Sequence, residues 1–158
     1  MTKQISLTQG KVALVDDNDY EWLMGWSWCF DGRYAVRGEN RNGRFYMHRQ
    51  IMGATHGEVT DHINQNKLDN HRCNLRLVTQ AQNGMNRLGN ANHTSRYKGV
   101  HLDQQTGMWR AQIKVGEKRL QLGRFANEVD AALAYNKSAV EHYGEFARLN
   151  ITEKDVRA

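Results

Sequence analysis

The sequence predicts an α+β fold in two parts, and three observations support this prediction. Apolar and polar residues alternate in several short runs, which is typical of strands buried on one face. A capping-box pattern at residues 79–82 and an apolar helical spacing after Asn127 predict helices among these strands. Residues 84–95 are mostly Gly, Asn, Ser, Thr and His, which indicates an exposed linker. The predicted parts are 1–83, the linker 84–95, 96–150 and a tail at 151–158.

The first part is expected to begin with a hairpin and a short helix. Residues 4–7 and 11–15 alternate as strands do, and residues 17–25 are compatible with a helix capped by Asp17. Three further alternating runs, separated by the turn dipeptides Asp-Gly and Asn-Gly, predict a small antiparallel sheet that leads into His48. These runs are 26–30, 34–36 and 45–47. The tryptophans crowded into this stretch are expected in the core rather than stacked on nucleic acid: Trp22, Trp26 and Trp28.

The second part is expected to be a three-stranded antiparallel sheet packed on one helix. Strands are predicted at 97–102, 109–115 and 119–122, with alternation in the last two that puts apolar residues on one face. A helix capped by Asn127 and ending at Gly144 would cover that face. The residues at helical spacing on its expected buried face are Val129, Ala132, Leu133, Asn136, Ala139, Val140 and Tyr143. The other face remains open and carries the candidate DNA-binding residues Lys98, His101, Arg110, Gln112, Lys114, Arg119 and Gln121.

Positive charge is concentrated on the second part. The chain has a formal net charge of +5, and residues 96–126 hold seven basic residues against two acidic ones. Scattered charge is usually a solvated face, but this clustering favours an anion-binding surface. On such a sheet Arg can read guanine, Gln can read adenine, and Lys mostly holds phosphate.

The cysteine count and the N-terminus exclude other classes of protein. Two cysteines without a CxxC pair rule out a disulfide framework and a four-thiolate zinc site, so any metal must be bound by oxygen or imidazole. Residues 1–13 resemble neither a secretory signal nor a membrane span. The expected location is the cytoplasm of a prokaryote or of a phage-infected host, with no membrane partner.

A carboxylate stands beside an imidazole at Asp61-His62. An isolated Asp-His dipeptide is more often a surface or turn feature than part of an active site. Neighbours on a regular strand point to opposite faces, so both serve one site only if the backbone twists or if each does a different task. Phosphodiester cleavage needs a base for the attacking water and positive charge on the phosphate. An ordinary histidine has a pKa of about 6.5, so His62 is a suitable base for the attacking water. Asp61 and Asn83 offer the oxygens that a hard divalent ion takes.

Other polar residues near this pair have weaker assignments. The amide oxygen of Asn74 could accept a proton from His62 and so orient the ring. His48 is either a second active-site group that steers a phosphate or a strand residue bonded to the backbone. Asn64, Asn66 and Asn70 are expected to form the loop rather than to bind.

Residues 61–83, DHINQNKLDNHRCNLRLVTQAQN, resemble the motif of HNH homing-type endonucleases. Met47-His48-Arg49 is similar to the step that precedes this motif in the family. The resemblance implies a ββα-metal module at the end of the first part. It also implies that Asp61 and Asn83 bind the metal, that His62 is the general base and that Asn74 orients it.

The second part resembles the DNA-binding domain of the ethylene-response-factor (APETALA) type. The motifs are YKGV at 97–100, WRAQI at 109–113, LGRF at 122–125, AALAY at 131–135 and GEFARLN at 144–150. This family lays its three-stranded sheet into the major groove, and its pairing with the first motif occurs in mobile endonucleases. Lys98 and His101 stand where the family often has arginine, so its base preference does not transfer.

Together these features predict a metal-dependent, homing-type endonuclease acting on double-stranded DNA. One divalent ion is expected, Mg²⁺ first and Mn²⁺ as the alternative, with no zinc. A single centre in a monomer would nick one strand, and a double-strand break would need two chains or two binding events. The alternatives are a non-catalytic DNA-binding regulator with a decayed nuclease module, and an RNA nuclease or nonspecific DNase that uses the sheet only for its charge.

Overall fold

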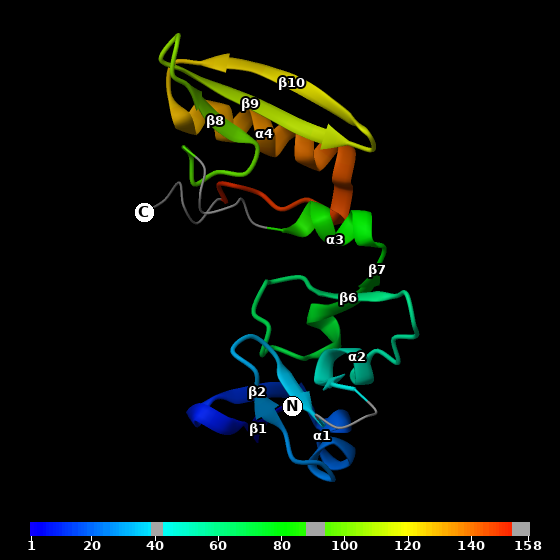
Figure 1. Ribbon diagram of the computed structural model, residues 1–158. Helices are drawn as coiled ribbons and strands as arrows, with labels where there is room; N and C mark the ends of the chain where they lie inside the picture. The colour runs from blue at the N-terminus through cyan, green and yellow to red at the C-terminus, as the bar shows by residue number, and fades with distance from the viewer. Residues whose placement is uncertain (39–42, 88–93, 153–158) are drawn as a thin grey trace. The chain divides into compact units, whose positions relative to one another are not determined.

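The computed structural model describes residues 1–38, 43–87 and 94–152, and it shows two units, Met1–Gln80 and Ala81–Ala158 (Figure 1). Each unit is described by itself. Both combine helices with antiparallel sheets, which confirms the α+β class. Asn42 of the predicted turn, half of the predicted linker and most of the predicted tail lie outside the described residues. Among the helices that are described, none has the length and apolar character needed to cross a membrane.

The first unit begins with the expected hairpin and helix. Strands β1 (Thr2–Ser6) and β2 (Val12–Asp16) pair antiparallel, and α1 (Asp17–Met24) follows directly. The cap position is Asp16 rather than Asp17, because Asp16 still has extended backbone angles.

The second small sheet is also present. Strands β3 (Cys29–Phe30), β4 (Ala35–Arg37) and β5 (Phe45–Tyr46) form an antiparallel sheet in the order β3-β4-β5. The chain then enters helix α2 (Met47–Ile51). His48 is therefore a helical residue, and of its two predicted alternatives the one as a strand residue was wrong.

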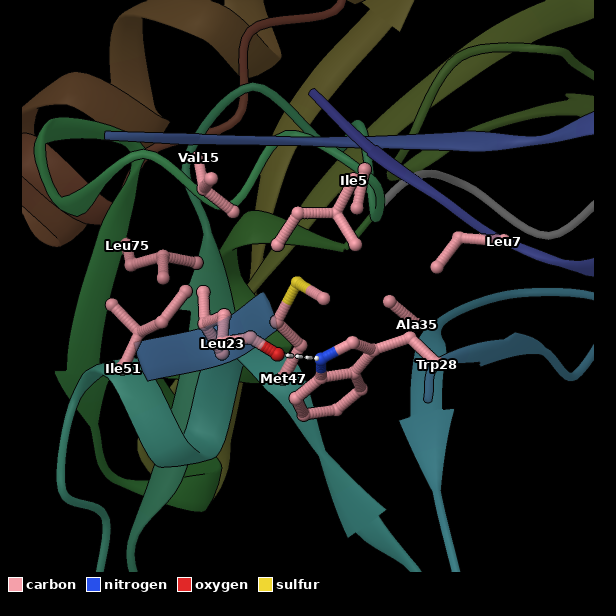
Figure 2. Packing of buried hydrophobic residues seen from close by; sticks show 10 residues of the cluster. Ile5, Leu7, Val15, Leu23, Trp28, Ala35, Met47, Ile51 and Leu75 are labelled. Atoms are coloured by element: carbon pink, nitrogen blue, oxygen red, sulfur yellow. Dashed lines mark hydrogen bonds between the residues drawn. The ribbon is translucent and has the colours of Figure 1, made fainter. Parts of the chain in front are cut away.

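The core of the first unit lies between these elements (Figure 2). Trp28 is buried in it and donates its indole N–H to the carbonyl of Leu23, 2.9 Å away. Trp22 and Trp26 are exposed, so their prediction as core residues was wrong. Trp22 donates to the carboxylate of Asp19 on the same helix instead, and Trp26 follows the end of α1.

A two-stranded ribbon and a long loop complete the first unit. Strands β6 (Val59–His62) and β7 (Leu75–Val78) pair antiparallel, and a short 3-10 turn, η2 (Arg72–Asn74), leads into β7. The loop is fixed to β2 by two backbone hydrogen bonds of 2.8 Å, from Leu14 to Leu68 and from Asn70 to Leu14. The N-terminal hairpin therefore supports the loop that follows His62.

Helix α3 (Gln80–Asn86) comes next in the chain, and all but its first residue belongs to the second unit. Residues 84–86 are thus helical where the linker was expected. Met85 packs against a cluster that contains Ile113 and Tyr143, and Asn86 is buried.

The second unit has the predicted sheet and helix. Strands β8 (Val100–Asp103), β9 (Met108–Val115) and β10 (Lys118–Phe125) form an antiparallel sheet in the order β10-β9-β8. Helix α4 (Glu128–Tyr143) packs on one face of the sheet (Figure 1), followed by a 3-10 turn, η3 (Gly144–Phe146). The side chain of Asn127 accepts a hydrogen bond from the backbone N–H of Asp130, which confirms the predicted cap.

The buried face of α4 differs from the predicted one. Ala131, Tyr135 and Ser138 are buried in addition to the expected Ala132, Ala139 and Tyr143. Three expected core residues are exposed instead: Val129, Leu133 and Val140. The helix is rotated so that small residues face the sheet, which allows a close approach. Ile151 is buried as well, so the fold continues into the predicted tail.

Candidate active site and nucleic-acid interface

Four rings from different elements meet in the first unit. His62 from β6 lies with its ring centre 5.0 Å from that of His48 on α2. Tyr34, which precedes β4, has its ring centre 4.9 Å from that of His48 and 6.2 Å from that of His62. Tyr46 from β5 lies 5.6 Å from His48. The structure therefore brings two of the predicted site residues together and adds two tyrosines.

Both histidines of this cluster are uncharged at neutral pH. Burial lowers the pKa of His62 from 6.5 to about 4, and burial together with the positive charge of a protonated His62 lowers the pKa of His48 to about 3. The ammonium of Lys67 acts on both histidines in the same direction. The sequence led us to expect an ordinary imidazole pKa for His62, and this expectation was wrong because the ring is buried. A neutral imidazole can accept a proton.

Asn70 orients the ring of His62. The amide nitrogen of Asn70 donates to the carbonyl of Leu68 at 3.3 Å and contacts the sulfur of Met47. Its amide oxygen must then face His62, where it lies 3.2 Å from Nε2. An amide oxygen can only accept, so Nε2 carries the proton and the lone pair is on Nδ1. Asn70 is fully buried, which keeps this arrangement rigid.

Asn74 has a different partner set from the one expected. Its amide oxygen accepts the backbone N–H of Asn64 at 3.0 Å, and its amide nitrogen donates to the carbonyl of Asp69 at 2.7 Å. Asn74 thus joins the two ends of the loop that carries Asn70. The predicted hydrogen bond from Asn74 to His62 is made by Asn70 instead.

Asp61 is buried against an arginine. As neighbours on β6, Asp61 and His62 leave opposite faces of the ribbon. Arg76, the register partner of Asp61 on β7, donates to its Oδ2 from Nη2 at 3.1 Å and from Nε at 3.3 Å. A buried carboxylate needs such a partner in order to remain ionised.

The donor chemistry around Asp61 suits a hard divalent ion. Carboxylate oxygens are ligands that Mg²⁺ takes, and Mg²⁺ needs few protein ligands because it keeps several waters. No group of three or more His, Cys, Asp and Glu side chains that could hold a metal occurs in the described parts of the chain. A site at Asp61 therefore relies on an amide oxygen as well. The expected second ligand, Asn83, is half-buried on α3 in the second unit.

The open face of the second unit carries most of the predicted DNA-binding residues. His101 pairs with Arg110 in the register of β8 and β9, and Gln112 and Lys114 follow on the same face, opposite the buried Ala111 and Ile113. On β10, Arg119 pairs with Lys114 and Gln121 pairs with Gln112. The side chain of Gln121 donates to that of Gln112 at 3.3 Å.

A hollow of about 360 Å³ opens on this sheet, lined by Arg110, Gln121, Gly123 and Arg124. It lies at a register shift between Gln121 and Gly123, where the strand pairing is irregular. Arg110 is ion-paired with Asp103, yet its Nε is buried and has no hydrogen-bond partner in the described structure. Arg124 was not among the predicted contacts, although its place in the basic segment could have indicated it.

Lys98 departs from its predicted role. Its ammonium donates to the carbonyls of Gly84 and Met85, at 3.1 and 2.6 Å, at the end of α3. Burial lowers the pKa of Lys98 to about 8. The structure therefore uses this charge to hold a helix end, where cations stabilise the last carbonyl groups.

The sequence-based prediction missed five residues of the first-unit site. Arg76 could have been found as the polar residue that alternates with Leu75 and Leu77 opposite Asp61. Asn70 was judged a loop former because nothing in an Asn-rich loop distinguishes one side chain from another. The remaining three depend on tertiary packing: Tyr34, Tyr46 and Lys67.

Comparisons with known proteins address both units. Residues 45–85 match the family model described as HNH endonuclease. The chain is 33% identical over 132 residues to the Uncharacterized HNH endonuclease L560 of Acanthamoeba polyphaga mimivirus, covering 83% of this chain and 67% of the relative.

Plant proteins also match part of the chain. Dehydration-responsive element-binding protein 2C of Arabidopsis thaliana is 44% identical over 59 residues, which are 36% of this chain and 17% of that protein. Dehydration-responsive element-binding protein 2E of the same plant is 39% identical over 75 residues, 41% of this chain and 30% of that protein. The chain thus spans less than a third of either plant protein. No solved structure matches the chain.

Proposed function

Because this chain belongs to the HNH endonuclease family, we propose that it is a metal-dependent, homing-type endonuclease that hydrolyses phosphodiester bonds at sites in duplex DNA selected by its second unit. The observation that carries the proposal is the state of His62. It is buried and neutral, its proton is held on Nε2 by Asn70, and it directly follows a buried carboxylate in the chain.

His62 acts as the general base. Nδ1 takes a proton from the water that attacks phosphorus, and the Asn70 oxygen stabilises the imidazolium through its hydrogen bond to Nε2. Lys67, whose charge acts on His62, adds positive charge near the phosphate. His48 packs against the base from α2 and limits the directions in which its ring can turn.

The carboxylate of Asp61 would hold one divalent ion, Mg²⁺ or alternatively Mn²⁺. When bound, such an ion neutralises charge on the scissile phosphate and on the leaving oxygen. Arg76 forms an ion pair with Asp61 at 3.1 Å and fixes the position of its carboxylate. A single centre of this kind breaks one strand per chain.

The second unit selects the DNA. Its open face presents Lys114, Arg119 and Arg124 for phosphates and the paired amides of Gln112 and Gln121 for base edges. The unpartnered Nε of Arg110 beside the hollow supports a contact there. The likeness to two plant proteins named as dehydration-responsive element-binding proteins supports this assignment.

A combined assay of binding and cutting tests the proposal. The purified chain is incubated with supercoiled plasmid and Mg²⁺, and mobility shifts are measured with a randomised duplex library, bulk duplex and structured RNA at fixed salt. We expect open-circle product, and cleavage ends from the library that share a sequence. Shifts without cutting in any divalent metal would establish the regulator instead. Equal affinity for all three nucleic acids would establish a nonspecific nuclease.

Asn70→Ala should slow cleavage by about 10- to 100-fold, the usual cost of removing the partner of a functional histidine. The reason is that Nε2 of His62 loses its acceptor, so the ring can turn and change tautomer. The measurement is the single-turnover rate at saturating protein, with the dissociation constant for DNA measured separately and expected to stay unchanged.

Asn74→Ala is the matched control, because it removes an amide from the same loop without touching His62. It should lower the free energy of unfolding with a smaller effect on the rate. If Asn74→Ala slows cleavage at unchanged stability while Asn70→Ala does not, then Asn74 is the orienting residue.

A further inference from the structure

An arginine on the first unit is held in place by aromatic rings. The guanidinium of Arg37 on β4 lies 3.8 Å from the ring centre of Trp26 and 4.6 Å from that of Phe45. Trp28 contributes a third, more distant ring at 5.8 Å. Arg37 Nε donates to the side-chain oxygen of Gln50 on α2 at 3.2 Å. Stacking and this bond together restrict the guanidinium to one orientation.

Among the described residues, 1–38, 43–87 and 94–152, no carboxylate forms an ion pair that neutralises the charge of Arg37. Other cations of the same unit are paired: Lys3 with Asp17, Arg44 with Asp31 and Arg72 with Asp19. Arg37 therefore combines a fixed geometry with a positive charge that has no carboxylate partner in the described parts of the chain.

The rings that hold Arg37 are themselves accessible. Trp26 is 51% exposed and Phe45 is 38% exposed, although both are large apolar residues. Large apolar side chains exposed together often mark a surface that binds a partner. An arginine stacked on rings keeps its terminal N–H groups available for the oxygens of a phosphate, which the planar guanidinium fits.

We propose that Arg37, held by Trp26, Phe45 and Gln50, contacts a backbone phosphate of duplex DNA from the first unit. This inference rests on the proposed function for its choice of partner, and it adds a DNA contact outside the sheet of the second unit. The contact is independent of base sequence, because a phosphate carries no sequence information. It holds the duplex against the unit that contains His62.

The salt dependence of DNA binding tests this contact in the full-length chain. The logarithm of the association constant falls linearly with the logarithm of salt concentration, with a slope of about −0.9 for each phosphate contact to duplex DNA. Arg37→Gln should make the slope shallower by about 0.9 and should weaken binding to every duplex by a similar factor. Arg37→Lys keeps the charge and should keep most of the slope.

Lys3→Gln is the control, since it removes the same unit charge from an exposed ion pair in the same unit. Its slope should equal that of the unsubstituted chain. Thermal unfolding midpoints of both variants should stay close to that of the unsubstituted chain, since neither side chain is in the core.

Four results would overturn the inference. An unchanged slope for Arg37→Gln does so while leaving the proposed function intact. Equal changes in slope for Arg37→Gln and Lys3→Gln would show that the effect comes from net charge and not from a contact at Arg37. Sedimentation could instead show a dimer that Arg37→Gln dissociates, with an unchanged slope of the salt dependence. That result would assign the surface to a second copy of the chain. Failure of the unsubstituted chain to bind DNA at any salt concentration would overturn both the inference and the proposed function.

Discussion

His62→Ala is expected to lower the rate of DNA cleavage by about 10²- to 10⁴-fold, the range contributed by a general base. The side chain is neutral at pH 7 because burial lowers its pKa to about 4, and Asn70 leaves its lone pair on Nδ1. No other group in the ring cluster has this combination, since His48 has an even lower pKa and the other two rings are tyrosines. The measurement is single-turnover nicking of supercoiled plasmid at saturating protein.

Two further measurements separate chemistry from folding. His62 is fully buried, so alanine leaves a cavity, and the free energy of unfolding must be measured alongside the rate. His62→Gln fills more of this space and cannot act as a base at neutral pH, so it should be equally slow. Both variants should bind duplex DNA with unchanged affinity. Retained cutting by either variant would falsify the assignment of His62.

Gly99→Ala is expected to destabilise the second unit by roughly 3 kcal/mol or more, through overpacking and a left-handed backbone. Gly99 has a φ of +74°, and an added Cβ would overlap the ring of Tyr135 and the carbonyl oxygen of Gln112. Tyr135 is a buried residue of α4, so its ring cannot move aside without opening the contact between helix and sheet. Urea unfolding should show the loss, and DNA binding should weaken with it.

Gly107→Ala provides the control for Gly99→Ala. Gly107 has a similar φ of +67°, but an added Cβ there meets nothing within 4 Å. Only the backbone strain remains, about 1–2 kcal/mol. Equal destabilisation by the two substitutions would show that the close approach between Gly99 and Tyr135 is not formed in solution.

Regular patterning made the second unit predictable from the sequence. Unbroken alternation in β9 identified its two faces, and Asn127 marked the start of α4. The residues of α4 that face the sheet were harder to predict. Val129 and Leu133 have helical spacing but are exposed, while Ala131 and Tyr135 are buried against the sheet instead. Hydrophobicity alone does not distinguish the two faces.

The site in the first unit was predictable in its chemistry and less so in its contacts. The Asp61-His62 pair stands out by residue type, whereas the choice between Asn70 and Asn74 depends on the path of the loop. That path is set by hydrogen bonds to Leu14, which is more than fifty residues away in the chain. Similarly, Trp26 packs against Arg37 instead of entering the core. Arg37 lies on β4, outside the tryptophan-rich stretch at residues 22–28, so this contact could not be predicted from that stretch alone.

Metal dependence is the most direct test of the central claim, that the chain cuts DNA with a divalent ion held at Asp61. The measurement is the rate of plasmid nicking by the full-length chain with Mg²⁺, after chelation, and after Mg²⁺ is restored, with Asp61→Asn measured in parallel. We predict a saturable rise with Mg²⁺, no product in chelator, recovery on restoration and little activity in Asp61→Asn at any concentration. An equal rate in chelator, or full activity of Asp61→Asn, would contradict the claim.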